Sequence, residues 1–490
     1  MRKFTFLLLM LLCVVGAKAA QDVIWKGNVS TLSYANNLQL DNTFFANVSA
    51  GDYLCIKWTL DETAAEEYRI AHSEEYRFYE VKFAFPYGSW DDVLLTSTNV
   101  SNISSTYVTE LSSAQVTKLK EYGLALQGHC VKYNDISIGS NYTTGSEIQY
   151  WDNDASTWKS SSTDNFTLPT GWGNRKLKGE ILANANIGDR IKVEFKETQP
   201  SLWDSQLEFI DNSSSWTKMN GYPIGGLTYL YYYIDENNIT AIKAGEIYLN
   251  GKDATITNIK LESCTRYYLL DPSNTNTSVS YLPSTAPINV KLTRKIDWNT
   301  TICVPFDVDN PYTAFGHEGA FYSLKEYNSG LVFTPASTLE AGKPYYATFN
   351  MDGISEVDKT MTFSFDDVTI NTTLTPSAEV SGLTMKGNYT SGMSMTDKYG
   401  VACVNHSGSW DWAFYKGGTG TTLNAFSAYV EGTISGARLD IVIDDEATGV
   451  NEVRSKMSEV RGEYFNLNGQ RIAQPTKGLY IVNGKKVVIK

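Results

Sequence analysis

The sequence predicts an all-β chain: two tandem jelly-roll-like β-sandwiches, a third β-module and a small C-terminal β domain. Three observations predict this class, namely an internal repeat, short runs in which apolar and polar residues alternate, and glycine turns between those runs. A chain of 490 residues is too long for a single hydrophobic core, since domains usually hold about 100–150 residues. Aromatic residues form 13% of the chain, and their rings pack well on pleated sheets.

The chain opens with the pattern of a secretory signal peptide over residues 1–19. Met1-Arg2-Lys3 is basic, residues 4–15 are apolar, and Ala17-Lys18-Ala19 supplies a cleavage site of small residues. The apolar run is shorter than the roughly 20 residues that a membrane-spanning helix needs, and no later run is continuously apolar. We therefore expect export without a membrane span.

A repeat relates residues 45–58 to residues 182–195. Gly51 matches Gly188 at an offset of 137, and later strands match at offsets of 126 and 123, so the second copy has shorter connections. In both copies a Gly-Asp turn leads into a strand in which every second residue is apolar. These apolar residues should face a core: Leu54, Ile56, Trp58, Ile191, Val193 and Phe195. The spacing around Val116–Lys120 predicts a short helix in each copy.

The chain therefore divides into six segments. A stretch rich in Ser, Thr and Asn between Asp271 and Pro287 reads as a linker, and a new alternating run starts at Ile288. The expected boundaries are 1–19 for the signal peptide, 20–140 and 141–265 for the two sandwich repeats, 266–287 for the linker, 288–446 for the third β-rich module and 447–490 for the C-terminal β domain.

The C-terminal segment has a recognisable pattern. The runs Tyr464–Ile472 and Pro475–Lys490 contain the hairpin signals Asn468-Gly469 and Asn483-Gly484, which predict three short strands. This segment resembles the C-terminal sorting-type domain of Bacteroidetes, which in type IX secretion directs passage across the outer membrane and attachment outside. The repeats resemble jelly-roll-like modules of exported Bacteroidetes proteins. The resemblance implies an exported protein, at the cell surface or extracellular, with the export machinery as a partner.

Composition and spacing exclude several chemistries. The 41 basic and 54 acidic residues give a net charge of −13, which disfavours nucleic acid as a partner. The four histidines lack metal-ligand spacing, and Gly417–Gly420 lacks the Lys-Ser/Thr of a nucleotide loop. We expect no catalytic residues, no metal and no cofactor, and hence no enzyme. The acidic pairs Asp61-Glu62, Glu66-Glu67 and Glu74-Glu75 predict a solvated loop.

Cys55 and Cys130 are the candidates for a disulfide bond. They align with Lys192 and Asp253, so both cysteines occupy positions that are charged in the second copy. Two positions that lose their charge together are expected to be neighbours in space, which fits a disulfide bond between the two cysteines. Export of the protein permits such a bond. Free cysteines that act as small apolar residues fit the same pattern.

The residues expected to bind a ligand lie in the second repeat. In the run from Thr228 to Ile234, every second residue is a tyrosine on the face that is mostly polar in the first copy. Tyr229, Tyr231 and Tyr233 would form a ladder with a spacing of about 7 Å, suited to stacking on sugar rings. Trp216 is a further candidate for ligand binding, at the rim of this tyrosine ladder. The other interpretation is that the tyrosines pack against the neighbouring module or line the sandwich interior.

These observations favour non-catalytic recognition at the cell surface, with a polysaccharide or surface glycan as the expected partner. A structural or adhesive protein that binds other surface proteins is the alternative, since sheet edges and tyrosine-rich faces suit protein contacts equally well. A cryptic glycoside hydrolase would need two carboxylates facing each other across a sugar.

Overall fold

The computed structural model describes residues 20–87, 90, 92–100, 105–140, 142, 145–197, 205–223, 227–272, 278–406, 409–433, 436–444, 464–465, 471–472, 478–482 and 485–489. The predicted signal peptide lies outside these residues. Strands form 49% of the structure and helices 11%, which confirms the all-β class. The chain divides into two units, one made of residues 1–270 and 276–291 and the other of residues 271–275 and 292–490.

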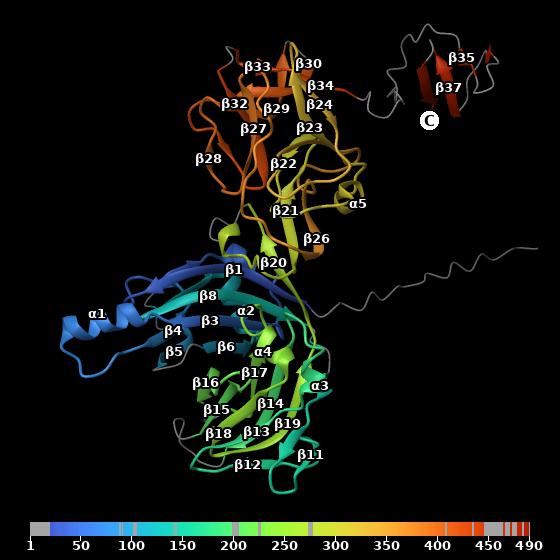
Figure 1. The fold of residues 1–490 in the computed structure, drawn as a ribbon. Coiled ribbons are helices and arrows are strands. Elements are labelled where there is room, and N and C mark those ends of the chain that lie inside the picture. Colours follow the sequence, from blue (N-terminus) through green and yellow to red (C-terminus); the bar gives the residue numbers. More distant parts are fainter. Residues whose placement is uncertain are drawn as a thin grey trace, which may run out of the picture. The chain divides into compact units, whose positions relative to one another are not determined.

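The first repeat forms two sheets that enclose a core (Figure 1). One sheet has the order β1-β8-β3-β6, formed by Ala20–Thr31, Val131–Ser140, Tyr53–Leu60 and Ser105–Glu110. The other has the order β2-β7-β4-β5, formed by Leu38–Leu40, Leu124–His129, Glu80–Ala84 and Val93–Asn99. Leu54, Ile56 and Trp58 lie in the core, as the alternation in β3 predicts.

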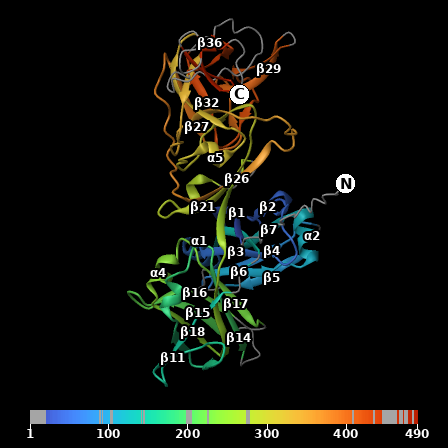
Figure 2. The ribbon, with the colours of Figure 1, turned by 90° about the vertical axis from the view of Figure 1, so that its right-hand side faces the viewer.

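The second repeat, drawn in Figures 1 and 2, has the same strand order in its two sheets. Its sheets run β12-β19-β14-β17 and β13-β18-β15-β16. The first consists of Phe166–Leu168, Ala254–Glu262, Arg190–Glu197 and Tyr229–Tyr233. The second consists of Gly173–Lys176, Ile247–Lys252, Gln206–Asp211 and Thr217–Pro223. Its core contains Ile191, Val193 and Phe195, as predicted. The repeated sheet order shows that the sequence repeat is a repeat of fold.

Short helices join the strands at equivalent places in the two copies. Helices α2 (Ser113–Tyr122) and α4 (Ile239–Ala244) follow β6 and β17 and confirm the predicted helical turns. The 3-10 helix η1 (Asn42–Phe45) precedes β3, and helix α3 (Gly179–Leu182) precedes β14. Leu119 of α2 and Ile242 of α4 are buried, so each helix closes an end of its sandwich core.

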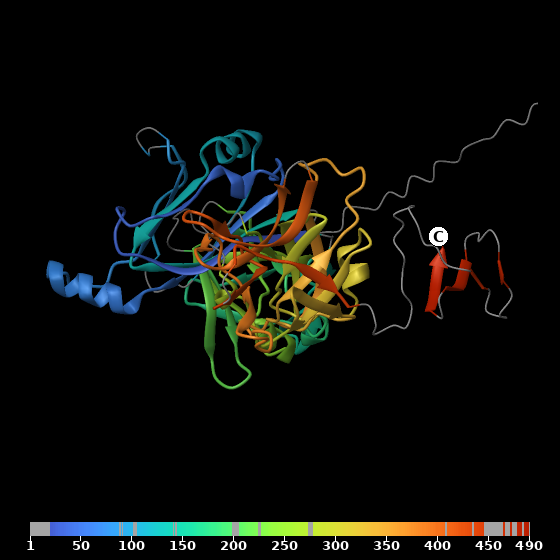
Figure 3. The ribbon, with the colours of Figure 1, turned by 90° about the horizontal axis from the view of Figure 1, so that it is seen from above.

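Helix α1 (Glu62–His72) replaces the solvated loop that the acidic pairs predicted. Asp61 caps this helix by accepting a hydrogen bond from the Ala64 backbone N–H, and Ser73 ends it in the left-handed conformation. Burial of Ala64 and a Glu66–Arg69 ion pair of 2.7 Å support the helix further. The caps and pairing thus outweigh the repulsion between neighbouring carboxylates. The helix extends from the edge of the first sandwich (Figures 1 and 3).

Three further strands, in the order β26-β21-β20 from the edge, belong to the first sheet, and β20 corrects the predicted linker. Strand β20 (Thr265–Leu270) pairs in parallel with β1, so the segment 266–287 does not begin as a linker. Tyr267, Tyr268 and Leu270 are buried there, and this burial outweighs the polar composition that follows. Strand β21 (Ile288–Lys295) lies beside β20, and its last four residues belong to the second unit. The short strands β9 (Ser146–Glu147), β10 (Tyr150–Asp152) and β11 (Thr157–Lys159) complete the second repeat.

The second unit holds two five-stranded sheets. The first, in the order β22-β25-β23-β24-β34, is built from Asn299–Ile302, Tyr345–Thr348, Ala320–Tyr327, Leu331–Pro335 and Ile441–Ile443. The second, in the order β27-β32-β29-β30-β33, is built from Leu383–Asn388, Ser427–Gly432, Tyr399–His406, Ser409–Lys416 and Arg438–Leu439. The smaller elements are η2 (Val279–Tyr281), in the first unit, and α5 (Pro311–Phe315), β26 (Thr360–Val368), β28 (Met393–Ser394) and β31 (Thr422–Leu423).

The C-terminal segment contains four strands among its described residues, where the sequence predicted three. They are β36 (Arg471–Ile472), β35 (Tyr464–Phe465), β37 (Gly478–Val482) and β38 (Lys485–Ile489), in that sheet order. Val482 pairs with Lys485, which is the register of a two-residue hairpin. The predicted turn residues themselves lie outside the described residues. Pairing of Tyr464 with Ile472 adds the fourth strand.

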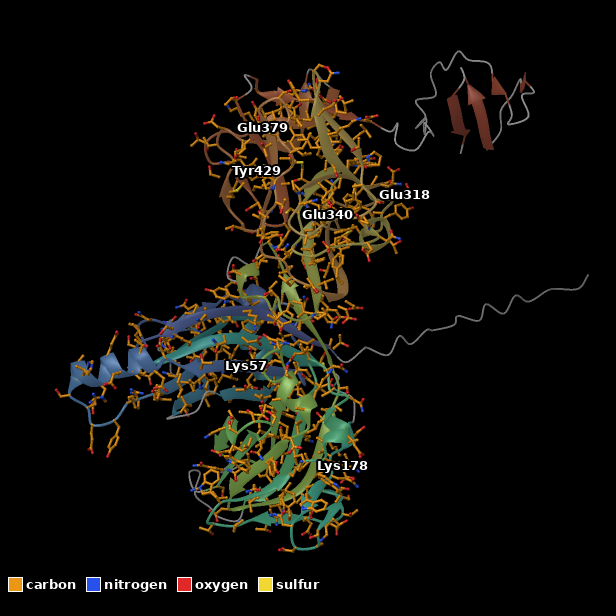
Figure 4. The ribbon with its side chains drawn as sticks, in the orientation of Figure 1. Lys57, Lys178, Glu318, Glu340, Glu379 and Tyr429 are labelled. Atoms are coloured by element: carbon orange, nitrogen blue, oxygen red, sulfur yellow. The ribbon has the colours of Figure 1, made fainter. Side chains whose placement is uncertain are left out.

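A cluster of charged side chains joins the two sandwiches of the first unit. Arg266 of β20 is fully buried and donates a hydrogen bond of 2.5 Å to Asp135 of β8. Lys57 of β3, labelled in Figure 4, pairs with Asp235, which follows β17 in the second sandwich. The ion-pair cluster consists of Lys26, Lys57, Asp135, Asp235, Glu236 and Arg266.

Glu236 depends on its cationic partners for its charge. Burial raises the pKa of Glu236, but Lys26, at 2.5 Å, and Arg266 outweigh burial, so the pKa lies below its ordinary value. The pKa of Asp135 is lowered for the same reason, because Arg266 and Lys26 outweigh its burial. Loss of either carboxylate charge would leave buried cations without compensation.

We expect the free energy of unfolding to fall as the pH drops below about 4.5. In the unfolded chain these carboxyls have pKa values of about 3.9 and 4.3, and the folded values lie lower. The folded state therefore binds fewer protons in this range, so acid favours unfolding. Glu236→Gln should lower the melting temperature at neutral pH and reduce the further loss on acidification, measured by circular dichroism.

Glu180→Gln is the matched control, because Glu180 forms an exposed ion pair with Lys178. It should behave as the wild type does throughout the titration. Equal acid sensitivity of Glu236→Gln and the wild type would contradict the assigned role of Glu236.

Candidate functional site

The contact between the sandwiches decides which sheet faces remain for binding. Each sheet turns one face to its own core. The other faces of β3 and β17 meet, where Tyr53 and Cys55 of the first sandwich pack with Tyr231 and Tyr233 of the second. Among the described residues, the cluster at this contact includes none from sheets β2-β7-β4-β5 and β13-β18-β15-β16, although edge strand β16 approaches β6.

The predicted tyrosine ladder is wrong as a sugar platform. Tyr231 and Tyr233 are only 6% and 2% exposed, whereas Tyr229 is 37% exposed. The alternation was read correctly, since Leu230 and Tyr232 of β17 face the core and Tyr231 and Tyr233 face away from it. That second face is covered by the first sandwich, so two of the three rings cannot stack on a ligand.

Arg190 of β14 explains why these rings are held in place. Its guanidinium carbon lies 3.4 Å from the ring centroid of Tyr142, 3.7 Å from that of Tyr231 and 4.4 Å from that of Tyr53. Its Nε also donates to Glu262 at 2.7 Å. A buried guanidinium needs such partners, and aromatic faces attract it. The tyrosines therefore have a structural role in the contact.

Two of the predicted ligand-binding residues stay accessible, Tyr229 and the more exposed Trp216. Trp216 precedes edge strand β16 and is 49% exposed. Its ring centroid lies 5.2 Å from that of Tyr248 on β18, at an interplanar angle of 54°. Tyr248 lies directly opposite Ile210 of β15 in the sheet register. The two rings thus form a partly exposed aromatic pair on the outer face of the second sandwich.

Fixed polar groups lie beside this pair. Asn250 is two residues from Tyr248 on β18, so both side chains share the outer face. Its amide Nδ2 donates to the Glu208 carboxylate on β15 at 3.1 Å, and Lys218 of β16 forms an ion pair of 2.6 Å with the same carboxylate. We refer to Trp216, Tyr248, Glu208, Asn250 and Lys218 as the Trp216 face.

The sequence contained a signal for Tyr248 that the prediction did not use. Ile247 and Leu249 lie in the core, so strand alternation alone turns Tyr248 and Asn250 outward. Tyr248 aligns with Ala125 of the first copy at the offset of 123, which marks it as a residue specific to the second copy. What the sequence could not provide was the position of Trp216 beside it, because Trp216 lies in a turn.

The predicted disulfide between Cys55 and Cys130 is wrong, and both thiols are free and buried. The β3–β8 register places Cys55 opposite Ser137, whereas the Cys130 carbonyl accepts a hydrogen bond from the N–H of Asp61, beyond the far end of β3. The six residues of strand from Cys55 to Asp61 span about 20 Å, whereas the two cysteines of a disulfide need a Cα separation of about 4–7 Å. The two side chains also face different clusters, the contact between sandwiches for Cys55 and the first core for Cys130.

Among the described residues, no group of three or more His, Cys, Asp or Glu side chains could hold a metal ion. None of the described helices combines the length and apolar composition needed to cross a membrane.

Comparison with known proteins gives little similarity. No family model matches the chain, and no curated protein matches it. A solved structure with local similarity is SGBP-B of the Bacteroides ovatus mixed-linkage glucan utilization locus, in complex with a mixed-linkage heptasaccharide. The identity is 15% and the TM-score 0.20, and the match covers 24% of this chain and 30% of that chain. A likeness of this size carries no argument about function.

We expect every cysteine among the described residues to be a free thiol. Alkylation of the unfolded chain without reductant should add one group at each of Cys55, Cys130, Cys264, Cys303 and Cys403, as read by intact mass. In the folded chain Cys55 should react slowly, because burial raises the pKa of its thiol to about 11. An adduct count that rises only after reduction would show a disulfide and contradict this assignment.

Proposed function

We propose that this chain is an exported, non-catalytic carbohydrate-binding protein and that the Trp216 face contacts the sugar. The observation that carries the proposal is the accessible Trp216 ring, which is paired with Tyr248 on the sheet face that turns away from the core of the second sandwich. An aromatic ring offers a flat apolar surface to the C–H face of a sugar, while its polar edge tolerates water.

The polar part of the Trp216 face suits hydroxyl groups. Lys218 is a donor with three N–H groups, and Glu208 is an acceptor with two oxygens, so both kinds of partner lie within one patch. Their mutual ion pair and the Asn250 amide fix the Glu208 carboxylate before any ligand arrives. Such preorganisation reduces the ordering cost of binding.

The same contacts favour binding over hydrolysis. Glu208 of the Trp216 face and Glu246, two residues before Tyr248, are each engaged by a lysine, Lys218 at 2.6 Å and Lys176 at 2.6 Å. A glycosidase instead needs one carboxyl group that can hold a proton and a second one facing it across the sugar. The proposed role is therefore recognition without catalysis.

Export and a position at the cell surface belong to the same proposal. They are supported by the signal-peptide pattern of residues 1–19 and by the resemblance of residues 447–490 to a C-terminal sorting domain. The partners would be a polysaccharide or surface glycan and the export machinery.

Adhesion to another surface protein is the second candidate function. It is favoured by the position of β16 at the end of its sheet, because an exposed edge strand can pair with an added strand of a partner. In that case Trp216 would supply an aromatic anchor next to the edge.

We expect Trp216→Ala to weaken binding of a retained polysaccharide by about thirtyfold, or about 2 kcal/mol, because hot-spot aromatics contribute energies of this size. The measurement is affinity electrophoresis of the full chain through gels that contain cellulose derivatives, xylan, mannan or starch. Tyr248→Ala should weaken binding as well, through loss of the paired ring.

Trp298→Ala is the matched control, since Trp298 is similarly exposed but belongs to the second unit. It should leave retention unchanged. Failure of all polysaccharides to retard the wild-type chain would reject the carbohydrate proposal and favour adhesion to protein.

A further inference from the structure

The hairpin of β10 and β11 interrupts a strand that is continuous in the first repeat. In the first repeat β1 pairs with β8 along its whole length, and five residues separate Val23 from Val29. At the offset of 123 the equivalent positions on β19 pair with Glu147 of β9 and Phe166 of β12, which 18 residues separate. The second repeat thus has 13 more residues here than the first, and insertions into one repeat often form its binding face.

Two tryptophans lie directly opposite each other on this hairpin. Trp151 of β10 pairs with Trp158 of β11, and their ring centroids are 5.3 Å apart at an interplanar angle of 74°. Tyr150 belongs to the core of the second sandwich, whereas neither tryptophan does. Strand alternation therefore turns the two tryptophans away from the core. Both are half-buried, so part of the pair stays accessible to a ligand.

The hairpin continues the sheet that carries the Trp216 face. Tyr150 forms an antiparallel bridge with Leu177, the residue that follows β13. Both side chains lie in the core, as expected for residues directly opposite each other in a sheet. Their neighbours Trp151 and Lys176 consequently turn to the outer face, the same face to which Tyr248 turns.

One row across the strands links the two aromatic pairs. Lys176 of β13 lies opposite Tyr248 of β18, so the row runs in the order Trp158, Trp151, Lys176, Tyr248. Trp151 and Tyr248 are two strand spacings apart, which is about 10 Å. A pyranose ring is similar in size to a phenyl ring, so one sugar unit covers one aromatic pair. A chain of several units is needed to contact both pairs.

The charged residue between the aromatic pairs already has a partner. Lys176 forms an ion pair of 2.6 Å with Glu246. A glycan with carboxylate or sulfate groups would have to compete with Glu246 for this lysine, whereas sugar hydroxyls can bond to both groups without separating their charges. The row therefore suits a chain of neutral sugar units.

The hairpin is held in shape before a ligand arrives. The Asp152 carboxylate accepts hydrogen bonds from the backbone N–H groups of Asp154 and Ala155, at 2.9 and 3.1 Å. It also forms an ion pair of 2.5 Å with Lys159, across the hairpin. These contacts fix the turn between β10 and β11, and such preorganisation reduces the ordering cost of binding.

We propose that Trp151 and Trp158 form a second subsite of the Trp216 face, so that the protein binds one extended chain of neutral sugar units across the strands. This inference rests on the proposed function. The first repeat lacks both parts of the row, because β1 runs through the position of the hairpin and Ala125 occupies the position of Tyr248. The hairpin and Tyr248 thus occur together in the second repeat.

Calorimetric titration of the full chain with hexasaccharides of cellulose, xylan, mannan and starch tests this inference. The wild type should bind one equivalent of one of these sugars. Trp158→Ala should weaken that binding about tenfold and Trp216→Ala about thirtyfold, because a single chain contacts both aromatic pairs. Trp158→Tyr should restore most of the affinity, since it returns an aromatic ring to the hairpin. Equal weakening by Trp158→Tyr and Trp158→Ala would contradict stacking at this position.

Thr157→Ala is the matched control, because Thr157 lies opposite Asp152 on the other face of the same hairpin. It should keep the affinity and stoichiometry of the wild type. A weakening as large as that of Trp158→Ala would show an effect of hairpin shape and overturn the subsite.

The pattern of losses separates this inference from the proposed function. One equivalent that Trp216→Ala weakens and Trp158→Ala preserves would reject the second subsite and leave the proposed function standing. Two equivalents, each removed by one of these variants, would show two independent sites and reject the single extended chain. Weakening by Trp158→Ala alone would reject the Trp216 face and the row with it. No binding of any hexasaccharide would reject both proposals.

Discussion

The buried contact between the two sandwiches is the constraint on which the first unit depends. It encloses Arg190 among tyrosine rings and Arg266 beside Asp135. A buried guanidinium that loses its partners costs several kcal/mol, so the groups around it must keep their positions. The contact therefore fixes two sheets against each other and buries Tyr231 and Tyr233 of β17.

This contact joins equivalent positions of the repeat. Tyr53 aligns with Arg190 at the offset of 137, and the two side chains touch, with the guanidinium 4.4 Å from the ring centroid. Val108 aligns with Tyr231 at the offset of 123, and both belong to the same cluster. Contact between equivalent residues is typical of a twofold interface between identical subunits.

The sequence predicted what depends on local periodicity and missed what depends on a partner surface. Leu54 and Ile56 face the core because strand alternation is a local property. The same alternation separated Tyr231 and Tyr233 from the core, but it could not show that a second sandwich covers them. The Cys55–Cys130 pairing failed because aligned charges carry no information about register along β3.

The prediction missed helix α1 and found only part of the Trp216 face, for related reasons. The capping of α1 by Asp61 was readable from the sequence, yet neighbouring acidic pairs suggested repulsion and hence a loop. Trp216 was recognised as a rim residue, whereas its partner Tyr248 was not, because their contact joins a turn to a strand.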